Sequence, residues 1–269
     1  DLLRAVVRPV IAAAKAAGAA RRWFFLRYAD PDFHLRLRVH GAPDALLGTV
    51  LPALHAAAAP AVAAGHIARL QLDTYEREVD RYGGPDGIDL AERLFHADSE
   101  AALAWIADHS ATADETARWR LALRGIDQLL DDLGLALVDK DHLTATLRDD
   151  LQRRLRAETP LLRAIGDRFR TERPALERLL DRAGDATHPL APALALFARR
   201  SAAVRPIVDE LRHRERAGRL TRPIAQQASS YVHLFANRVA RAHPVEQELM
   251  LYSFLARLYR TRLARSDGA

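Results

Sequence analysis

The sequence predicts an α+β protein that is predominantly α-helical and has a small antiparallel β-sheet near its N-terminus. Residues 34–40, HLRLRVH, alternate strictly between polar and apolar side chains, which is typical of a half-buried strand. After residue 85, leucine and alanine recur at helical spacing, which indicates amphipathic helices. The 269 residues, of which 49% are hydrophobic, suffice for one domain. Within it we expect a lobe of helix and sheet over residues 1–85 and a helical lobe over residues 86–269.

The first 85 residues contain the predicted sheet. The aromatic-rich segment 23–28 and the alternating segment 34–40 flank Asp30, Pro31 and Asp32, which is a turn composition, so we expect a β-hairpin. Residues 67–77 also alternate and predict a third strand. The expected order is therefore a helix at 2–17 interrupted at Pro9, strands at 23–28 and 34–40, a helix at 44–64 and a strand at 67–77.

Most of the remaining chain is predicted to be helical. It follows the chain-breaking sequence YGGP at residues 82–85, and each predicted segment carries leucine or alanine along one face. Helices on one face of an antiparallel sheet would complete the fold. The expected helices span residues 89–109, 113–133, 140–158, 174–183, 189–217, 222–241 and 244–265, the fifth bent at Pro206.

Composition excludes several classes of function. The chain has no cysteine, which removes disulfides, thiolate nucleophiles and cysteine-bound zinc, and it has no HExxH pattern, so we expect neither a metal nor a cofactor. The net charge of +5 is almost all arginine and is mixed with acidic residues, which favours an acidic peptide partner over direct nucleic-acid binding. Without a signal peptide or a long apolar run, we expect a cytoplasmic protein with no membrane contact.

The alternating strand places several cationic side chains on one face of the sheet. His34, Arg36 and Arg38 share a face because strand side chains alternate. If residues 67–77 lie in the same sheet, Arg77 joins them, and converging guanidinium groups would bind a carboxylate or an oxyanion. The alternative is an ordinary solvated sheet face on which the arginines are balanced by Asp73 and its acidic neighbours Glu76 and Glu78.

A polar stripe runs along the predicted helix 222–241. Gln226, Ser230, His233 and Asn237 recur at helical spacing in an otherwise apolar segment. Because histidine titrates near neutral pH, His233 is a candidate acid or base whose ring Ser230 or Asn237 could orient. The alternative is a core histidine whose hydrogen bonds are purely structural.

Two other sets of residues carry little functional signal. Glu246 and Glu248 open the last predicted helix, where helix capping explains acidic residues at least as well as catalysis. The chain has no GxSxG motif and no cysteine-histidine pair, so a serine or cysteine hydrolase is not supported.

Three segments together resemble a known family. WFFLRYADP at residues 23–31, followed by HLRLR at 34–38, is similar to the opening motif of the lantibiotic dehydratase C-terminal domain, also called the thiopeptide-type bacteriocin biosynthesis domain. YEREVDRYGG at residues 75–84 and SYVHLFANR at 230–238 resemble its second and third motifs. The three motifs occur in the family's order and extend over nearly the whole chain.

The resemblance implies a reaction and a set of residues. In this family a partner domain or protein attaches glutamate to serine or threonine hydroxyls of a precursor peptide, and the eliminating domain then expels glutamate to leave dehydroalanine or dehydrobutyrine. The implied partners are a precursor peptide with a leader and a glutamylated core and a separate glutamylating component, and a second copy of the chain is a further candidate partner. The implied catalytic residues are Arg36, Arg38, Arg77 or Arg81, and His233, and we expect His34, Tyr75, Ser230 and Asn237 to bind substrate.

Two other functions remain open from the sequence. A pyridine synthase on a related scaffold joins two dehydroalanines by cycloaddition and releases the leader peptide, but it has no glutamate to bind, so retention of Arg36, Arg38 and His233 favours elimination. The third possibility is a non-catalytic protein that binds acidic leader-peptide residues through its arginine face.

Overall fold

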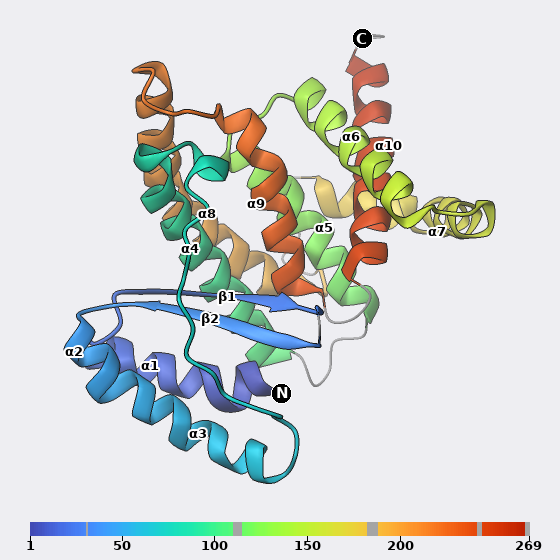
Figure 1. Ribbon diagram of the computed structural model, residues 1–269. Coiled ribbons are helices and arrows are strands. Elements are labelled where there is room, and N and C mark those ends of the chain that lie inside the picture. The colour runs from blue at the N-terminus through green and yellow to red at the C-terminus, as the bar shows by residue number, and fades with distance from the viewer. Residues whose placement is uncertain (31, 110–114, 182–187, 241–243, 267–269) are drawn as a thin grey trace.

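The computed structural model confirms a predominantly helical α+β fold with a two-stranded antiparallel sheet near the N-terminus (Figure 1). It describes residues 1–30, 32–109, 115–181, 188–240 and 244–266. Four positions named in the predictions lie outside the described residues: Pro31 of the turn and the predicted helix ends at residues 113, 183 and 241.

The sheet is the predicted hairpin. Strand β1 spans Arg22–Tyr28 and strand β2 spans His34–His40. Their register pairs Phe24 with Arg38, Leu26 with Arg36 and Tyr28 with His34, so these six side chains share one face. The intervening positions face the other way, where Trp23 and Phe25 are buried and the alternate apolar side chains of β2 pack on the core.

Side chains from two helices bind the outer edge of β1. Helix α4 spans Pro85–His109 and helix α9 spans Ile224–Val239. The backbone N–H of Phe25 donates to Ser99 Oγ on α4 at 3.3 Å, and that of Arg27 donates to Asn237 Oδ1 on α9 at 2.8 Å. Because edge strands leave backbone groups unpaired, these side chains hold β1 against the helices in a defined register.

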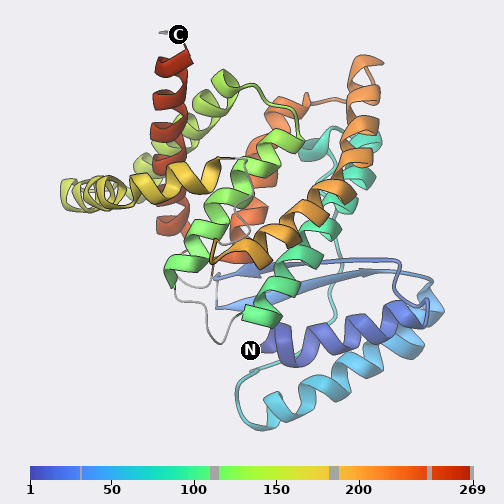
Figure 2. The same ribbon diagram turned by 180° about the vertical axis from the view of Figure 1, so that it is seen from behind.

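The predicted third strand at residues 67–77 is wrong. Residues 66–79 form an irregular connection, which we call the strap, that crosses the face of the sheet carrying Arg36 and Arg38 (Figures 1 and 2). Its alternation buries neither face, since Leu70 and Leu72 are 49% and 73% exposed. Period-two alternation marks a strand only where one face is buried, and in the strap only Ile67, Tyr75 and Val79 are even partly buried.

The strap ends in a tight turn at Gly83 and Gly84. Both have a positive φ, 84° and 83°, which glycine adopts without steric penalty. A Cβ at Gly83 would also lie 2.7 Å from Nε2 of Gln227 on α9. The turn therefore places the start of α4 against α9.

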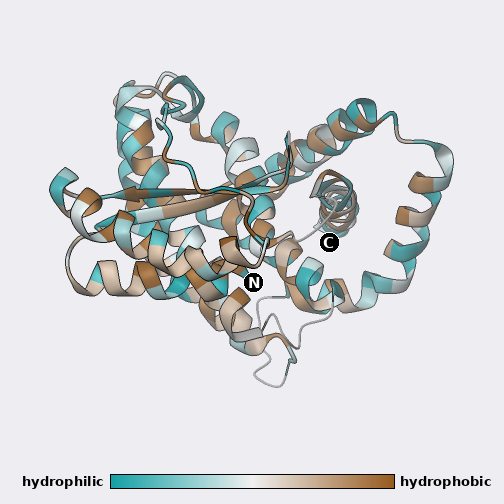
Figure 3. Ribbon diagram, turned by 60° about the horizontal axis from the view of Figure 1, so that its bottom comes forward, coloured by the Kyte–Doolittle hydropathy of each residue, from teal (hydrophilic) through white to brown (hydrophobic). Residues whose placement is uncertain are grey.

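Two helical segments flank the hairpin. The first comprises a π-helical turn at Leu3–Val7 and α1, Arg8–Ala16, so the irregularity expected at Pro9 lies just before it. The second is continuous through α2 (Pro43–Ala45), a π-helical turn (Leu46–Val50) and α3 (Leu51–Ala63). By length and composition alone, Pro43–Ala63 could cross a bilayer, with a window of mean hydropathy 1.6 that is only 11% buried, which corrects the expectation that the chain has no long apolar run. Its pale brown ribbon in Figure 3 reflects its alanines.

The helices that follow α4 form the rest of the fold. Residues 159–173 were not predicted to be helical, but α7 begins at Thr159 with Pro160 in its first turn and continues through Pro174. Its buried side chains, among them Phe169, Leu176 and Leu180, offset the hydrogen bond that an internal proline removes. The remaining helices are α5 (Glu115–Asp132), α6 (Leu137–Leu155), α7 (Thr159–Leu180), α8 (Ala191–Arg216) and α10 (Pro244–Ser266).

Candidate active site

Arg36 and Arg38 lie in a cavity of about 340 Å³ between the sheet and the strap. The two arginines share a face of β2, as the alternation predicts, and the strap closes over them. The described residues lining this cavity, which we call the arginine cavity, are Phe24, Leu26, Tyr28, Arg36, Arg38, Asp73, Thr74, Tyr75, Glu76, Glu78, Tyr82, Phe95 and Leu234.

Aromatic rings hold both guanidinium groups in place. The guanidinium carbon of Arg36 lies 3.8 Å from the centre of the Tyr28 ring, and its Nε donates to His34 Nε2 at 3.0 Å. That of Arg38 lies 4.9 Å from the centre of the Tyr75 ring, and its buried Nε has no hydrogen-bond partner in the described part of the chain. Burial lowers the pKa of Arg38, which an incoming carboxylate would reverse.

The strap brings one aromatic and several acidic side chains to the arginine cavity. Burial raises the pKa of Tyr75, with a further contribution from its hydrogen bond to Glu92, so its hydroxyl stays protonated at neutral pH. Asp73, Glu76 and Glu78 line the cavity, yet no ion pair joins them to Arg36 or Arg38 within the described residues. The two arginines therefore retain donors for a ligand.

The structure places Arg77 and Arg81 outside the lining of the arginine cavity. Arg77 donates from Nε and Nη2 to the two carboxylate oxygens of Glu92, at 2.7 and 3.0 Å. Because the third strand does not form, Arg77 is not brought onto the sheet face beside Arg36, which corrects the predicted convergence. Arg81 pairs with Glu78 at 2.6 Å, and Glu78 lines the cavity. Which of the two arginines acts on substrate stays open.

His233 forms an acid-base pair with a residue of the last helix. Its Nδ1 lies 2.8 Å from Oε2 of Glu248, which is 4% exposed and also accepts a hydrogen bond from the Tyr252 hydroxyl at 3.0 Å. The hydrogen bond to Glu248 raises the pKa of His233. Half of the His233 side chain remains exposed, so Glu248 orients the imidazole through Nδ1 while the ring stays accessible to solvent.

The other two polar residues of the α9 stripe differ in what they do. The Asn237 amide donates to the Arg27 carbonyl at 2.7 Å and accepts from its N–H, so it holds β1 and does not orient His233. Ser230 is half-buried. The roles of both in substrate binding stay predictions. His233 is not among the described residues lining the arginine cavity, but its neighbour Leu234 is.

Sequence reasoning missed Glu248 by interpreting it as a helix cap. The structure instead buries this carboxylate between His233 and Tyr252. The available signal was its context: Glu248 precedes the apolar run 249–252, LMLY, where a single acid is costly to bury without a partner. Tyr252 follows it by four residues and so lies on the same helix face.

Among the described residues, no group of three or more histidine, aspartate or glutamate side chains has the arrangement of a metal site. The side chains of this site carry guanidinium, imidazole, phenol and carboxylate groups.

The sequence matches the family described as "Lantibiotic biosynthesis dehydratase C-term" over residues 1–259. The chain belongs to this family.

Two curated relatives are biosynthesis proteins for named lantibiotics. Subtilin biosynthesis protein SpaB of Bacillus subtilis is 31% identical over 137 residues, which is 51% of this chain and 13% of SpaB. Nisin biosynthesis protein NisB of Lactococcus lactis subsp. lactis is 38% identical over 79 residues, 29% of this chain and 8% of NisB. The chain thus matches only a small part of either relative's length.

Solved structures share the fold of this family member. The tRNA-dependent lantibiotic dehydratase MibB from Microbispora sp. 107891 superposes with a TM-score of 0.68 at 26% identity, over 97% of this chain and 27% of MibB. TsrL gives a TM-score of 0.67 at 17% identity, covering 98% of this chain and 91% of TsrL. The pyridine synthase TbtD from thiomuracin biosynthesis gives 0.63 at 19% identity, covering 97% and 94%. The last two likenesses concern the fold alone.

Proposed function

We propose that this protein eliminates glutamate from glutamylated serine or threonine residues of a ribosomally made precursor peptide. The observation that carries the proposal is the pair Arg36 and Arg38, held on tyrosine rings in a cavity and without an ion-pair partner among the described residues. Membership of the lantibiotic dehydratase C-terminal family supports the same reaction.

The reaction needs cationic donors at two places. A base removes the proton from Cα of the modified residue, the electron pair forms the Cα–Cβ double bond, and the Cβ–O bond breaks to release the glutamate carboxylate. Negative charge builds on the neighbouring peptide carbonyl and on the departing carboxylate. Guanidinium groups stabilise both charges by donating paired hydrogen bonds, so Arg36 and Arg38 suit this role.

His233 is the group we assign to proton transfer. Glu248 accepts from Nδ1 and leaves Nε2 as the ring nitrogen for substrate, as a buried carboxylate does for a catalytic imidazole. The raised pKa of His233 makes the imidazole a stronger base once it is neutral. Since Leu234 lines the arginine cavity and His233, the residue before it, does not, the peptide would extend from the cavity to His233.

The remaining assignments belong to the same proposal. We assign a further cationic contact with the substrate, beside those of Arg36 and Arg38, to Arg77 or Arg81. We assign other substrate contacts to His34, Tyr75, Ser230 and Asn237. The precursor peptide is the proposed substrate, and the proposed partner is a separate glutamylating component. No metal or cofactor enters the proposed reaction.

Mass spectrometry of a glutamylated peptide incubated with the protein tests this function. Loss of glutamate with formation of a dehydro residue is the expected result, and Arg36→Gln with Arg38→Gln should leave the glutamylated peptide intact. A parallel incubation with a peptide that already contains two dehydroalanines tests cycloaddition. Ring formation in that arm, without glutamate loss in the first, would replace elimination by pyridine synthesis.

A further inference from the structure

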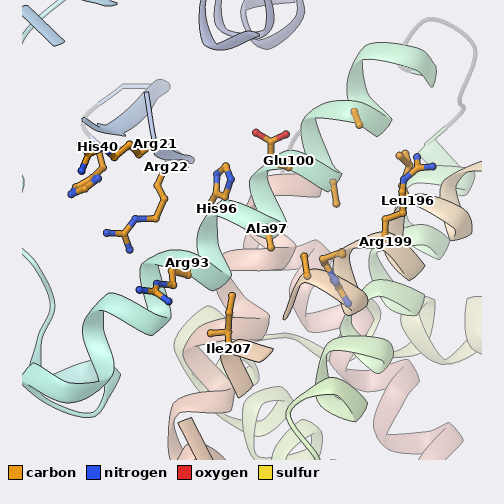
Figure 4. A pocket seen from close by; sticks show the side chains of 14 residues that line it. Arg21, Arg22, His40, Arg93, His96, Ala97, Glu100, Leu196, Arg199 and Ile207 are labelled. Atoms are coloured by element: carbon orange, nitrogen blue, oxygen red, sulfur yellow. The ribbon is translucent and has the colours of Figure 1, made fainter. Parts of the chain in front are cut away.

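A second and larger cavity lies between α4 and α8. It has a volume of about 710 Å³ and begins at the end of the hairpin where Arg22 pairs with His40 (Figure 4). We call it the α4–α8 groove. Among the described residues, none lines both this groove and the arginine cavity, so the two are distinct sites.

The floor of the groove is apolar, and four of its six described residues are alanines. On α4, three residues spaced four and then three positions apart line one side of the groove. On α8, three residues spaced seven and then four positions apart line the opposite side. The residues of this floor are Ala97, Ala101 and Ala104 on α4 and Leu196, Ala203 and Ile207 on α8. Such a floor leaves room for a polypeptide backbone and its apolar side chains between the two helices.

The rim of the groove is cationic. The described residues lining the groove include five arginines, of which Arg200 is buried, and one carboxylate, that of Glu100, which already binds Lys15 at 2.7 Å. Arg22 and Arg93 share the single carboxylate of Asp89, at 2.7 and 3.0 Å.

Two rim arginines are available for a ligand. The side chains of Arg21 and Arg199 are exposed, lie on opposite sides of the groove in Figure 4, and form no ion pair with any described residue. The uncompensated positive charge therefore flanks the apolar floor.

We propose that the α4–α8 groove binds a peptide segment with alternating acidic and apolar side chains. The apolar side chains would lie on the alanine floor, and the acidic ones would reach the rim arginines. From Leu196 to Ile207 the floor extends over about 16.5 Å of α8, at 1.5 Å per residue, so about five residues of extended chain fill it, at roughly 3.3 Å each.

The lining favours a peptide over a nucleic acid. Single-stranded nucleic acids are bound through bases stacked on aromatic side chains, and the described lining of the groove contains no phenylalanine, tyrosine or tryptophan. Its apolar floor would contribute nothing to phosphate binding.

The position of the groove identifies the peptide as a part of the substrate outside its modified residues, and this step rests on the proposed function. His40 in the groove follows Arg38 in the arginine cavity by two residues of β2, about 7 Å of strand. A precursor anchored in the groove would therefore present its neighbouring residues to the arginine cavity.

Fluorescence anisotropy with the whole protein tests the groove. The probe is a fluorescein-labelled peptide of about eight alternating glutamate and leucine residues, long enough to exceed the roughly five that fill the groove, and the matched probe has glutamine for glutamate. We expect only the acidic probe to bind, with an affinity that falls as salt is raised. Equal binding of both probes, binding of neither, or displacement of the acidic probe by transfer RNA would overturn the proposal.

Variants on the two sides of the groove locate the binding. Arg21→Glu combined with Arg199→Glu should weaken the acidic probe by roughly tenfold or more, from two lost and reversed charge contacts. Ala203→Trp, at an exposed position of the floor, should do the same by filling the groove. Arg69→Glu combined with Arg205→Glu, the same charge change at two exposed positions outside the groove, should bind like the unaltered protein. Unchanged binding by both groove variants would overturn the assignment.

The binding assay needs no turnover, so the two proposals can fail separately. If glutamate elimination is not observed but the groove variants lose the acidic probe, the groove stands and the proposed function falls. If elimination occurs and the groove variants show unchanged KM for a glutamylated peptide that carries an acidic segment, only the groove as a substrate-binding site is overturned.

Discussion

At the scale of single residues, Arg38 is the side chain on which the proposed elimination depends most. Its Nε has no partner in the described structure, and its guanidinium lies over Tyr75. Arg38→Gln removes the charge and keeps a hydrogen-bond donor on a shorter side chain. We expect kcat for glutamate elimination to fall by about 10²- to 10³-fold, the usual effect of deleting one donor to a developing anion. Single-turnover mass spectrometry of a glutamylated peptide measures it.

The matched control for Arg38 is Arg69→Gln in the exposed strap. It changes the net charge equally but lies outside the arginine cavity, so its rate should equal that of the unaltered protein. A comparable loss of rate in both variants would mean that overall charge, and not the cavity, determines activity.

Glu248 controls the proton affinity of His233. Glu248→Gln removes the carboxylate whose hydrogen bond raises the pKa of the imidazole, so the pKa of His233 should move down. If the neutral imidazole is the base, the ascending limb of the pH–rate profile should move to lower pH with it. Titration of the His233 ring protons by NMR gives the pKa independently of activity. A profile that stays in place while the NMR pKa moves would exclude His233 as the base.

The same pair should make stability depend on pH. Because the folded pKa of His233 lies above its ordinary value of 6.5, its pair with Glu248 stabilises the fold fully below that value. The stabilisation is lost as the pH rises through the folded pKa. The difference in unfolding free energy between the unaltered protein and Glu248→Gln, from urea denaturation, should therefore shrink as the pH is raised. A difference that grows with pH would contradict the sign of the shift.

Local patterns predicted some of these residues and could not predict others. The alternation HLRLRVH was sufficient to place Arg36 and Arg38 on one face, because a strand fixes the direction of every second side chain. The partner of His233 comes from a different helix 15 residues further on, and no period in the sequence encodes which face of α10 meets α9. Glu248 could be recognised only as an acid beside an apolar run.

At the scale of elements, Asn237 joins helix α9 to the edge of β1. Asn237→Ala leaves the N–H and C=O of Arg27 without their partners, and orphaned backbone groups of this kind cost about 1–3 kcal/mol each. We expect the free energy of unfolding to fall by about 2 kcal/mol or more. Urea denaturation followed by circular dichroism measures this.

Gln226→Ala is the matched control for Asn237. It lies on the same helix, is exposed, and should change stability by less than about 0.5 kcal/mol. If the two variants were equally stable, the amide of Asn237 would not be holding the strand in solution.

The two elements that were predicted wrongly from the sequence differ in cause. Residues 67–77 alternate but lie in the strap, where few side chains are even partly buried, and alternation identifies a strand only when packing buries one of its faces. Residues 159–173 do bury a face, with Ile165 and Phe169, but they lie between Pro160 and Pro174, which indicate helix breaks in a sequence pattern. The first helix of the chain and the hairpin were predicted because their patterns coincide with burial.

At the scale of the whole molecule, a buried charge network connects four helices beneath the sheet. Asp98 on α4 lies 3.7 Å from Arg200 on α8 and 3.6 Å from Arg238 on α9, and all three side chains are fully buried. Arg200 also lies 3.5 Å from Asp132 on α5, and Arg238 donates to Ser99, which accepts from the β1 backbone. The network therefore extends from the interior of the helices to strand β1, which contributes Phe24, Leu26 and Tyr28 to the arginine cavity.

Removing one member of this network should be far more damaging than removing the charged cluster as a whole. Asp98→Asn leaves Arg238 without a carboxylate in the core, and breaking a buried ion pair in this way costs about 3–5 kcal/mol. A triple variant replaces Asp98 by leucine and both Arg200 and Arg238 by methionine, which removes all three buried charged groups. It should lose less stability than Asp98→Asn, because it leaves no buried charge without a partner. The one charge that loses its partner is that of Asp132, which is partly exposed. Urea denaturation gives the unfolding free energies of both variants.

The control is Asp209→Asn, which removes an exposed ion pair with Arg212 and should change the unfolding free energy by less than about 1 kcal/mol. A triple variant less stable than Asp98→Asn would mean that the network holds the helices together by its specific geometry, beyond the need to compensate buried charge.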